Sequence, residues 1–392
     1  MVRPPTLLRI WGSHFKSLEH AERIASYFAA ARAAGWSCHI VTSREPADAA
    51  WLAPLHRDGI TIHHLDRAHG NFDRRYIARA RRLCRDVAAD VMHCDNTHTS
   101  PLIGAALAGV SVRLWTKHAM QPAFEEMRAA TMRERLAPAV RTSASLSTMI
   151  LPISGAIRDE MIDLGISSRK LRVLPLPIAP VTAPLIPAAD ARRQWGLQPH
   201  HLVFGTVGRS LAVKGWDLLV KAFAGVHKLF PDSRLLLVGS TASNEERRWR
   251  AHLDAIIGAA GIGSAVVFTG HLTSAAEGLA AMDAFVLPSR SEGFSLALVE
   301  ALAASLPVVS ARVGIAPDIV TDRVHGLLVD RDDVSGLTRT LIDLAGNAQL
   351  RAQLAAAAPL AVSALPTPQQ HAQTLLSIYE SLLSRRGRSR AS

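Results

Sequence analysis

The sequence contains few cysteines and no long hydrophobic run. Its cysteines are Cys38, Cys84 and Cys94, an odd number without the spacing of a disulfide framework. This excludes a disulfide-stabilised scaffold and indicates reduced thiols in a reducing compartment. No uncharged apolar stretch reaches the length of about 18 residues that a membrane-spanning helix needs. We find no signal peptide either, because Arg9 interrupts the short apolar run near the start, and we therefore expect a cytoplasmic protein.

Aromatic residues are also scarce, at 5% of the chain. They are not interleaved with basic residues, which argues against nucleic-acid binding by base stacking. The net charge is nevertheless +11, and arginines concentrate in residues 67–86 and 384–392. Two interpretations of these segments stay open. In the first, the arginines form a solvated helix face and a frayed tail. In the second, they make peripheral contact with anionic lipid on the inner face of a membrane.

Strand-like apolar runs alternate with longer helical patterns along the whole chain. With 392 residues, 48% of them hydrophobic and 20% charged, the composition suits two globular domains. Residues 18–35 are expected to form one helix that Gly35 closes. The predicted strands are residues 6–12, 37–43, 60–65, 90–95, 111–118 and 147–154, then 202–208, 233–239, 265–270, a part of 279–289, 307–312 and 325–330.

A proline-rich segment, residues 174–190, separates the two halves. Proline at this density continues neither a helix nor a central strand, so the segment is the expected linker. We predict an α/β fold with a first domain of residues 1–178 and a second of residues 179–365. A last helix over 366–384 is expected to pack back on the first domain. The βαβ rhythm predicts two Rossmann-like doubly wound domains that face each other across a cleft and bind ligands at the carboxyl ends of their strands.

The stretch "FGTVGRSLAVKGWDLL" places two cations in a loop after a predicted strand. Gly208 ends the strand and lets a ligand approach the backbone closely. Arg209 and Lys214 follow, and their charges suit a diphosphate. The alternative is an ordinary surface turn with two cations. The spacing matches neither a Walker loop nor the dinucleotide-binding fingerprint.

The stretch "SRSEGFSLALVEALAASLPVV" follows another predicted strand. We expect a helix to begin near Phe294 or Ser295. The first backbone N–H groups of this helix, from about Phe294 to Leu298, would form an anion site together with the helix dipole. A diphosphate bound there would lie close to the two cations of the other loop.

Two acids frame this helix. Glu292 precedes it, and Glu300 lies about two turns inside an otherwise apolar run. A carboxylate in apolar surroundings needs a partner, and Glu300 could accept hydrogen bonds from a vicinal diol such as ribose. The alternatives are that Glu300 pairs with a distant arginine in a structural network and that Glu292 only complements the helix dipole.

These segments resemble glycosyltransferase family 4, whose members are retaining enzymes of the two-Rossmann-domain (GT-B) architecture. The sequence E-G-F-S-L-A-L-V-E has the E-x7-E form of that family, and "VGRSLAVKGWDLLVKAF" resembles its donor-phosphate segment. With "LLLVG", "VVFTGHL" and "MDAFVLPS", the resemblance runs from about Leu202 to Val329. In the first half, "WTKHAM" resembles the strand-ending histidine segment of the family, at His118. Two departures are that Gly12 stands alone where the family has a glycine pair, and that "LPLPI" replaces an Asn-Gly.

The resemblance implies a role for each matching residue. Arg209 and Lys214 would stabilise the leaving diphosphate, Glu300 would hold the ribose, and Glu292 would orient the sugar hydroxyls without acting as a nucleophile. His118 would lie near the reacting sugar. The implied catalytic residues are Glu292, His118, Arg209 and Lys214, and the implied donor-binding residues are Gly12, Gly208, Arg209, Lys214, His271, Leu272, Glu292, Gly293, Phe294, Ser295, Leu296 and Glu300.

The reaction implied is transfer of a sugar from a UDP- or GDP-linked donor, held mainly by the second domain, to a hydroxyl of a glycan, lipid-linked or small-molecule acceptor. The anomeric configuration would be retained, and no cofactor would be needed. Two other functions stay open. One is a nucleotide-sugar epimerase or hydrolase, and the other is an inactive nucleotide-sugar-binding module.

Two clusters superficially resemble metal sites. "HCDNTH" supplies His93, Cys94, Asp95 and His98, but its spacing matches no standard zinc pattern, and a strand-end loop is the better interpretation. "DRDD" contains a D-x-D at Asp330 and Asp332, which we expect at the surface. The two cations already supply the charge that a diphosphate needs, so we predict no metal.

Overall fold

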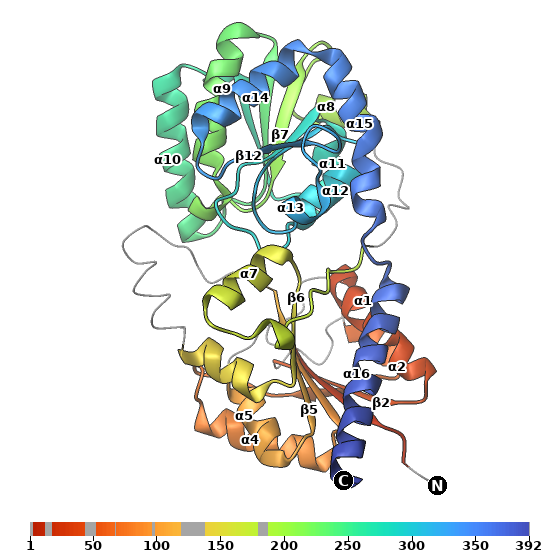
Figure 1. Ribbon diagram of the computed structural model, residues 1–392. Helices are drawn as coiled ribbons and strands as arrows, with labels where there is room; N and C mark the ends of the chain where they lie inside the picture. Colours follow the sequence, from red (N-terminus) through yellow and green to blue (C-terminus); the bar gives the residue numbers. More distant parts are fainter. Residues whose placement is uncertain are drawn as a thin grey trace. The chain divides into compact units, whose positions relative to one another are not determined.

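The computed structural model describes residues 3–11, 18–43, 52–66, 68–95, 99–118, 138–178 and 187–391, with only the backbone for 18–20 and 386–391. The chain forms two compact units (Figure 1). Unit 1 comprises Met1–Ala179 and Leu365–Ser392, and unit 2 comprises Pro180–Ala364.

Unit 1 contains a parallel six-stranded sheet in the order β3-β2-β1-β4-β5-β6. This is the strand order of the Rossmann fold, in which the direction of strand addition reverses between the first and fourth strands. The strands are β1 Thr6–Trp11, β2 Ser37–Thr42, β3 Thr61–His64, β4 Val91–Asp95, β5 Val112–Lys117 and β6 Met149–Pro152.

The helix predicted over residues 18–35 is in fact two helices. Between them, Tyr27 and Phe28 donate short-range backbone hydrogen bonds to Ile24 and Ala25, and both aromatic side chains are buried in the core of unit 1. Packing of this aromatic pair thus overrides a continuous helical pattern. The helices of unit 1 are α1 Leu18–Ser26, α2 Ala29–Ala33, α3 Ala53–Arg57, α4 Arg74–Asp86, α5 Ser100–Ala108, α7 Gly155–Asp163, the 3-10 turn η2 Ser168–Lys170 and α16 Pro368–Ala391.

The carboxyl-terminal helix α16 belongs to the core of unit 1. Its residues Leu375, Ile378 and Tyr379 are buried in the same hydrophobic cluster as strands β1, β2 and β4. The Tyr379 hydroxyl also lies 2.6 Å from Nδ1 of His93, in β4. Figure 1 shows α16 running alongside α2 and the sheet.

Unit 2 repeats the same topology. Its parallel sheet has the order β12-β11-β10-β7-β8-β9. The strands are β7 Leu202–Val207, β8 Ser233–Val238, β9 Val266–Gly270, β10 Ala284–Leu287, β11 Val308–Ala311 and β12 Leu327–Val329. The helices are α8 Ala188–Gln194, η3 Ala212–Lys214, α9 Trp216–Leu229, α10 Asn244–Ala260, η4 Gly263–Ala265, α11 Ala275–Ala280, α12 Leu296–Ala303, α13 Ala316–Ile319, α14 Val334–Gly346 and α15 Ala348–Ser363.

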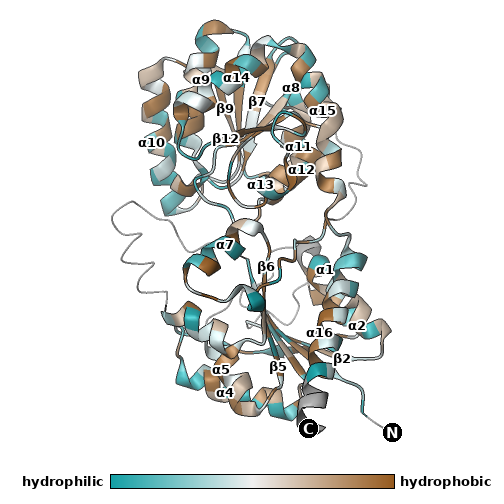
Figure 2. Ribbon diagram, in the orientation of Figure 1, coloured by the Kyte–Doolittle hydropathy of each residue, from teal (hydrophilic) through white to brown (hydrophobic). Residues whose placement is uncertain are grey.

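Both sheets are hydrophobic because helices cover both of their faces. Figure 2 shows their strands mainly in brown, and residues such as Leu8, Leu236 and Phe285 are fully buried. The prediction of two Rossmann-like α/β domains is therefore confirmed. None of the helices within the described part of the chain has the length and hydrophobicity needed to cross a bilayer.

Several helices begin at a side-chain cap. Asp73 accepts from two backbone N–H groups at the start of α4, Ser154 caps α7, and Ser243 with Glu246 forms a capping box on α10. Such caps satisfy N–H groups that a helix leaves unpaired. Helix α12 is one of the helices without such a cap, because its N-cap residue Ser295 makes no side-chain cap hydrogen bond.

Candidate functional site

Two loops of unit 2 leave the same edge of the sheet. Strands β7 and β10 are hydrogen-bonded neighbours, with Phe204 opposite Ala284 and Gly205 opposite Phe285. Because these strands are parallel, residues 208–215 after β7 and the loop after β10 emerge side by side. This is the point at which strand order reverses, where doubly wound folds bind their ligands.

Glycines bring these loops together. Gly215 has a φ of +65°, and a Cβ there would lie 2.0 Å from the carbonyl oxygen of Pro288. A Cβ at Gly239, after β8, would lie 1.5 Å from the carbonyl oxygen of Gly208. Only glycine allows both approaches. Gly208 itself lies beside the stem of Lys214, which a Cβ would meet at 3.6 Å.

Arg290 joins the two loops by hydrogen bonds. Its backbone N–H donates to the Val213 carbonyl (2.8 Å), and its Nη1 donates to the Ala212 carbonyl (2.7 Å). Its Nη1 and Nη2 also form a bidentate pair with Asp217, at 2.8 Å each, and its Nε lies 2.9 Å from Asp332 Oδ1. We call this set, Arg290 with Ala212, Val213, Asp217 and Asp332, the Arg290 network.

Asp217 is buried in the first turn of α9. Burial alone would raise the pKa of its carboxyl, but the hydrogen bonds and charge of Arg290 lower that pKa instead. Sequence reasoning missed Arg290 and Asp217. The available signal was an acid inside the otherwise apolar helix segment "GWDLLV", which requires a partner.

Lys214 and Glu292 form an ion pair across the two loops. Lys214 Nζ lies 2.7 Å from Glu292 Oε1, which also accepts a 2.7 Å hydrogen bond from Ser289 Oγ. Their side chains are 26% and 9% exposed, respectively. The sequence predicts that the two residues contact different parts of a ligand, and it does not predict this pair. An anionic ligand could compete with Glu292 for the Lys214 ammonium.

Helix α12 begins at Leu296, slightly later than predicted. Ser295 is its N-cap, with a left-handed φ of +81°, so the backbone N–H groups of the first turn are left for another acceptor. Phe294 is buried, and its carbonyl accepts a hydrogen bond from Ile315 N–H. The Phe294 side chain therefore anchors the loop. Gly293 lies between Phe294 and the Lys214–Glu292 pair in the chain.

The remaining predicted residues of unit 2 lie at the same edge of the sheet. Arg209 is exposed directly after Gly208, and Glu300 is half-buried on α12, one turn after Leu296 and on the same helix face. His271 is exposed and Leu272 half-buried after β9, two strands or about 10 Å from β7.

In unit 1, His118 follows β5 and belongs to a buried charge network. Its Nε2 lies 3.1 Å from Asp95 Oδ1, at the end of β4. Asp95 also accepts from Arg9 of β1, at 3.0 Å from Nε and 2.7 Å from Nη2. Trp11 contacts the His118 ring edge-to-face, with centroids 5.7 Å apart. Gly12 lies outside the described residues.

Arg9 and Asp95 are almost completely buried. Burial would raise the pKa of Asp95, but the adjacent Arg9 charge and the neighbouring histidines lower it well below its usual range. The pair thus stays ionised inside the protein, and Asp95 presents a negative charge to His118.

The histidine-rich segment of β4 has partners within unit 1. His93 Nδ1 and Nε2 lie 2.6 Å from the hydroxyls of Tyr379 and Thr116, respectively, and Cys94 is buried. His98 lies outside the described residues. In the described ranges there is no group of three or more His, Cys, Asp or Glu side chains that could hold a metal ion. Asp330 and Asp332 are exposed, as expected, although Asp332 joins the Arg290 network.

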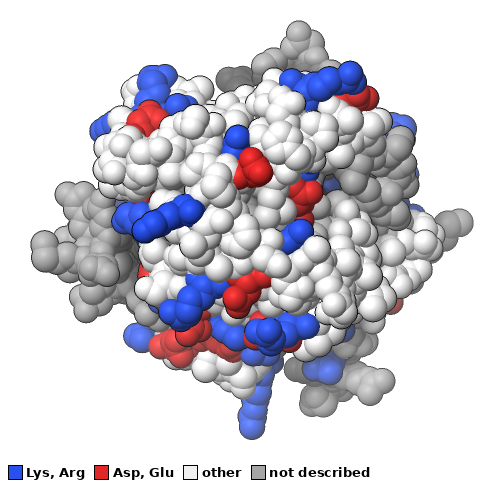
Figure 3. Space-filling model, turned by 90° about the horizontal axis from the view of Figure 1, so that it is seen from above, with Lys and Arg blue, Asp and Glu red and all other residues white. Residues whose placement is uncertain are grey.

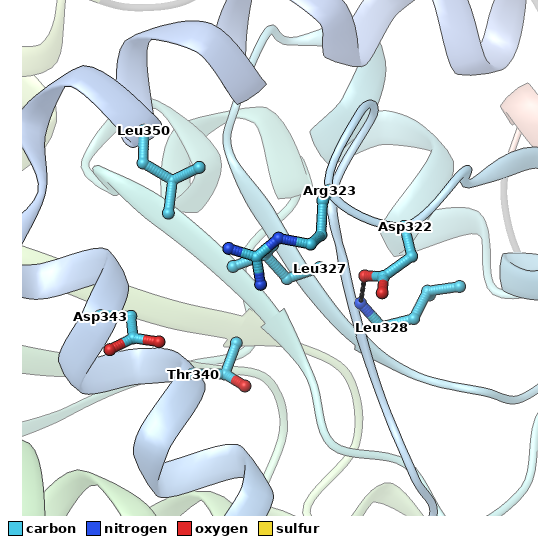
Figure 4. Close-up of a pocket in the computed structure, with 7 residues that line it drawn as sticks. All are labelled: Asp322, Arg323, Leu327, Leu328, Thr340, Asp343 and Leu350. Carbon is cyan, nitrogen blue, oxygen red and sulfur yellow. Dashed lines mark hydrogen bonds between the residues drawn. The ribbon is translucent and has the colours of Figure 1, made fainter.

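A small pocket of about 70 Å³ lies elsewhere in unit 2 (Figure 4). It is lined by Asp322, Arg323, Thr340 and Asp343 together with leucines, including Leu327 at the start of β12. In a parallel sheet all strands begin at one edge and end at the other. This pocket therefore lies at the edge opposite the Arg290 network and is not part of the candidate site.

Each half of the chain matches a glycosyltransferase family model. Residues 20–177 match the family described as glycosyl transferase 4-like domain, and residues 188–360 match glycosyl transferases group 1. The D-inositol 3-phosphate glycosyltransferase of Stackebrandtia nassauensis is 37% identical over 206 residues, covering 50% of this chain and 45% of that protein. The lipopolysaccharide core biosynthesis mannosyltransferase LpsB of Rhizobium meliloti is 29% identical over 199 residues, covering 50% and 56%. The chain thus spans about half the length of these relatives.

Solved glycosyltransferase structures share the fold over nearly the whole chain. Anabaena HepE in complex with UDP has a TM-score of 0.77 at 19% identity, covering 96% of this chain and 100% of HepE. A Rickettsia africae glycosyltransferase has a TM-score of 0.76 at 14% identity, covering 97% and 99%. The first half of the chain therefore matches a glycosyl transferase 4-like domain, the second half matches glycosyl transferases group 1, and the fold is the two-Rossmann-domain fold of the GT-B glycosyltransferases.

Proposed function

We propose that this protein transfers a sugar from a nucleotide-diphosphate sugar to a hydroxyl acceptor with retention of anomeric configuration. The observation that carries the proposal is the convergence of Lys214, Glu292 and the uncapped start of α12 at the β7–β10 switch point of unit 2. A cation beside unpaired backbone N–H groups suits a diphosphate, and a carboxylate beside both suits the attached sugar.

In the proposed reaction, the bond between the sugar C1 and the diphosphate oxygen breaks as the acceptor oxygen bonds C1 on the same face. The leaving phosphate takes the acceptor proton. Lys214 and Arg209 would stabilise the charge that grows on the diphosphate, which is where positioned cations accelerate a reaction most. These cations supply the charge without a metal ion. As Lys214 turns to the diphosphate, the Glu292 carboxylate becomes available to the sugar hydroxyls.

The other predicted residues complete this proposal. Glu300 would accept hydrogen bonds from the ribose diol, and the backbone at His271 and Leu272 would contact the base. In unit 1, His118 would contact a hydroxyl of the reacting sugar.

UDP- and GDP-linked sugars are the proposed donors. UDP is supported by Anabaena HepE, whose fold this chain shares and whose structures contain UDP and UDP-glucose. The acceptor would be a glycan, a lipid-linked sugar or a small polyol in glycoconjugate or polysaccharide biosynthesis. One relative is named for inositol 3-phosphate and another for the lipopolysaccharide core, and both names are consistent with hydroxyl-bearing acceptors.

We also propose a cytoplasmic protein that contacts anionic lipid through α4. All six arginines of this helix are exposed, and Asp86 is its one acid. On the face shown in Figure 3, by contrast, Lys and Arg are interspersed with Asp and Glu. Such an arginine-rich face is attracted to anionic headgroups. Cosedimentation with phosphatidylglycerol vesicles, lost when Arg75, Arg79 and Arg82 are replaced by glutamine, would support this, whereas equal binding to neutral vesicles would contradict it.

The test of the catalytic proposal is incubation with UDP- and GDP-sugars and a panel of hydroxyl acceptors, with the product anomer assigned by NMR. Glu300→Gln should abolish donor binding or turnover. Glu277→Gln, an equally half-buried acid on α11, is the matched control and should leave both unchanged. Consumption of donor without acceptor would favour the epimerase or hydrolase, and donor binding without any transfer would favour the inactive module.

A further inference from the structure

We propose that Arg290 is a positioning residue, which sets Lys214 and Glu292 at the separation that donor turnover requires. This inference rests on the proposed function. Arg290 lies two residues before Glu292, and its partners Ala212, Val213 and Asp217 lie on both sides of Lys214 in the chain. With such short chain segments between them, the Arg290 network fixes where both functional side chains begin.

The contacts of Arg290 show that it positions other residues and does not bind the ligand itself. A guanidinium has five N–H donors. Nη1 donates to Ala212 and Asp217, Nη2 donates to Asp217, and Nε faces Asp332. Four of the five donors are therefore committed to the protein. The hydrogen bonds to Asp217 raise the pKa of Arg290 by more than burial lowers it, and Asp332 raises it further, so the guanidinium stays charged.

Three separate segments meet at this one side chain. Ala212 and Asp217 belong to the loop after β7 and the start of α9, Arg290 belongs to the loop after β10, and Asp332 follows β12. Lysine could not replace this arrangement, because a single ammonium cannot span a bidentate carboxylate and two further acceptors in fixed directions. Without the Arg290 side chain, the first two loops would keep the backbone hydrogen bond from residue 290 to the Val213 carbonyl and the close approach of Gly215 to Pro288.

Loss of the network should affect turnover more than binding. A displacement of about 1 Å in a catalytic group can cost roughly 100-fold in rate. We therefore expect Arg290→Lys to lower kcat roughly 100-fold, while the Kd for UDP or GDP alone rises by less than about tenfold, because the α12 N–H groups remain in place. Asp332→Ala removes only the exposed contact and should lower kcat by no more than a few-fold.

Arg192→Lys is the matched control. Arg192 also pairs with a carboxylate and a carbonyl in unit 2, at 2.7 Å from Asp283 Oδ2 and 3.1 Å from the Ala281 oxygen. These partners precede β10, so they lie at the opposite edge of the sheet. Arg192→Lys should destabilise the protein to a similar extent and leave kcat unchanged. Equal kcat in the two variants would overturn the positioning role.

A second measurement does not depend on activity. In a double-mutant cycle, the Lys214→Ala and Glu292→Ala changes should be coupled in the unfolding equilibrium of the wild-type background. That coupling should disappear in the Arg290→Lys background and persist in Arg192→Lys. Persistence in both backgrounds would refute the inference. If the wild type transfers no sugar while the coupling still depends on Arg290, the proposed function fails and the positioning role stands.

Discussion

The two units share one strand order, but the ion pairs at the carboxyl edges of their sheets differ in exposure. In unit 1, the Arg9 and Asp95 side chains are 2% and 1% exposed. In unit 2, Lys214 and Glu292 are 26% and 9% exposed. The same fold thus holds one charge pair inside the protein and another at its surface.

The exposure of each pair determines whether it can exchange a partner. A buried ion pair has lost its hydration and cannot exchange its partner without a large penalty, so Arg9 and Asp95 form a fixed frame for His118. A partly exposed pair is worth little in isolation, and an incoming anion can replace one partner at small cost. We therefore interpret the first pair as structural support and the second as a ligand-binding pair.

The largest expected effect comes from breaking the buried pair. Asp95→Ala leaves the Arg9 guanidinium charged and buried beside the Tyr27 ring, and we expect a loss of about 3–5 kcal/mol in the free energy of unfolding. Urea denaturation followed by circular dichroism measures this loss. Glu292→Ala is the comparison in unit 2 and should cost much less, because the Lys214 ammonium it leaves unpaired can reach water. Equal losses would erase the distinction between the two pairs.

Removing the lysine of the exposed pair should lower kcat strongly while changing the free energy of unfolding little. Lys214→Ala removes a cation from the proposed diphosphate site, so kcat should fall about 10²- to 10³-fold, or roughly 3–4 kcal/mol of transition-state stabilisation. The free energy of unfolding should change by less than about 1 kcal/mol. Steady-state kinetics and thermal unfolding of one preparation test both parts, and a stable variant with wild-type kcat would remove Lys214 from the mechanism.

The sequence predicts features that depend on neighbouring residues, but not contacts between residues far apart in the chain. Alternating apolar runs and strand-end glycines predicted the two sheets and the two loops around Lys214 and Glu292, because these signals are local. The partners of charged residues were not predictable in this way. Arg290 and Asp217 are 73 positions apart, and only the adjacency of β7 and β10 brings them together. The break at Tyr27 and Phe28 likewise depends on a core assembled from distant strands.

The buried His371 should make unit 1 sensitive to acid. Burial, and then the charge of Arg9, lower the pKa of this histidine to about 4. An unfolded histidine titrates near 6.5. Above that pH both states are neutral at this site. As the pH falls from about 6.5 to 4, the unfolded state gains a proton that the native state does not, and stability falls by on the order of 3 kcal/mol.

Urea titrations at several pH values should therefore show that the free energy of unfolding of unit 1 falls steeply as the pH is lowered from 6.5 to 4. His371→Gln should flatten that decline, even though it weakens the hydrogen bond to the Pro175 carbonyl. An unchanged slope would mean that other groups, such as the buried His93, dominate the acid response.

The smallest expected difference concerns two glycines with nearly equal backbone geometry in unit 2. Gly215 and Gly261 have φ values of +65° and +68°, but an added Cβ meets the Pro288 carbonyl only at Gly215, since nothing lies within 4 Å at Gly261. Gly261→Ala should cost about 1 kcal/mol from the left-handed conformation alone. Gly215→Ala should cost about 1–3 kcal/mol more from the steric overlap, measured by urea denaturation. Because that overlap would push the Lys214 loop away from Glu292, Gly215→Ala should also lower kcat, whereas Gly261→Ala should not. Equal costs and equal rates would mean that the two loops of the exposed pair can separate freely, in contrast to the fixed frame around His118.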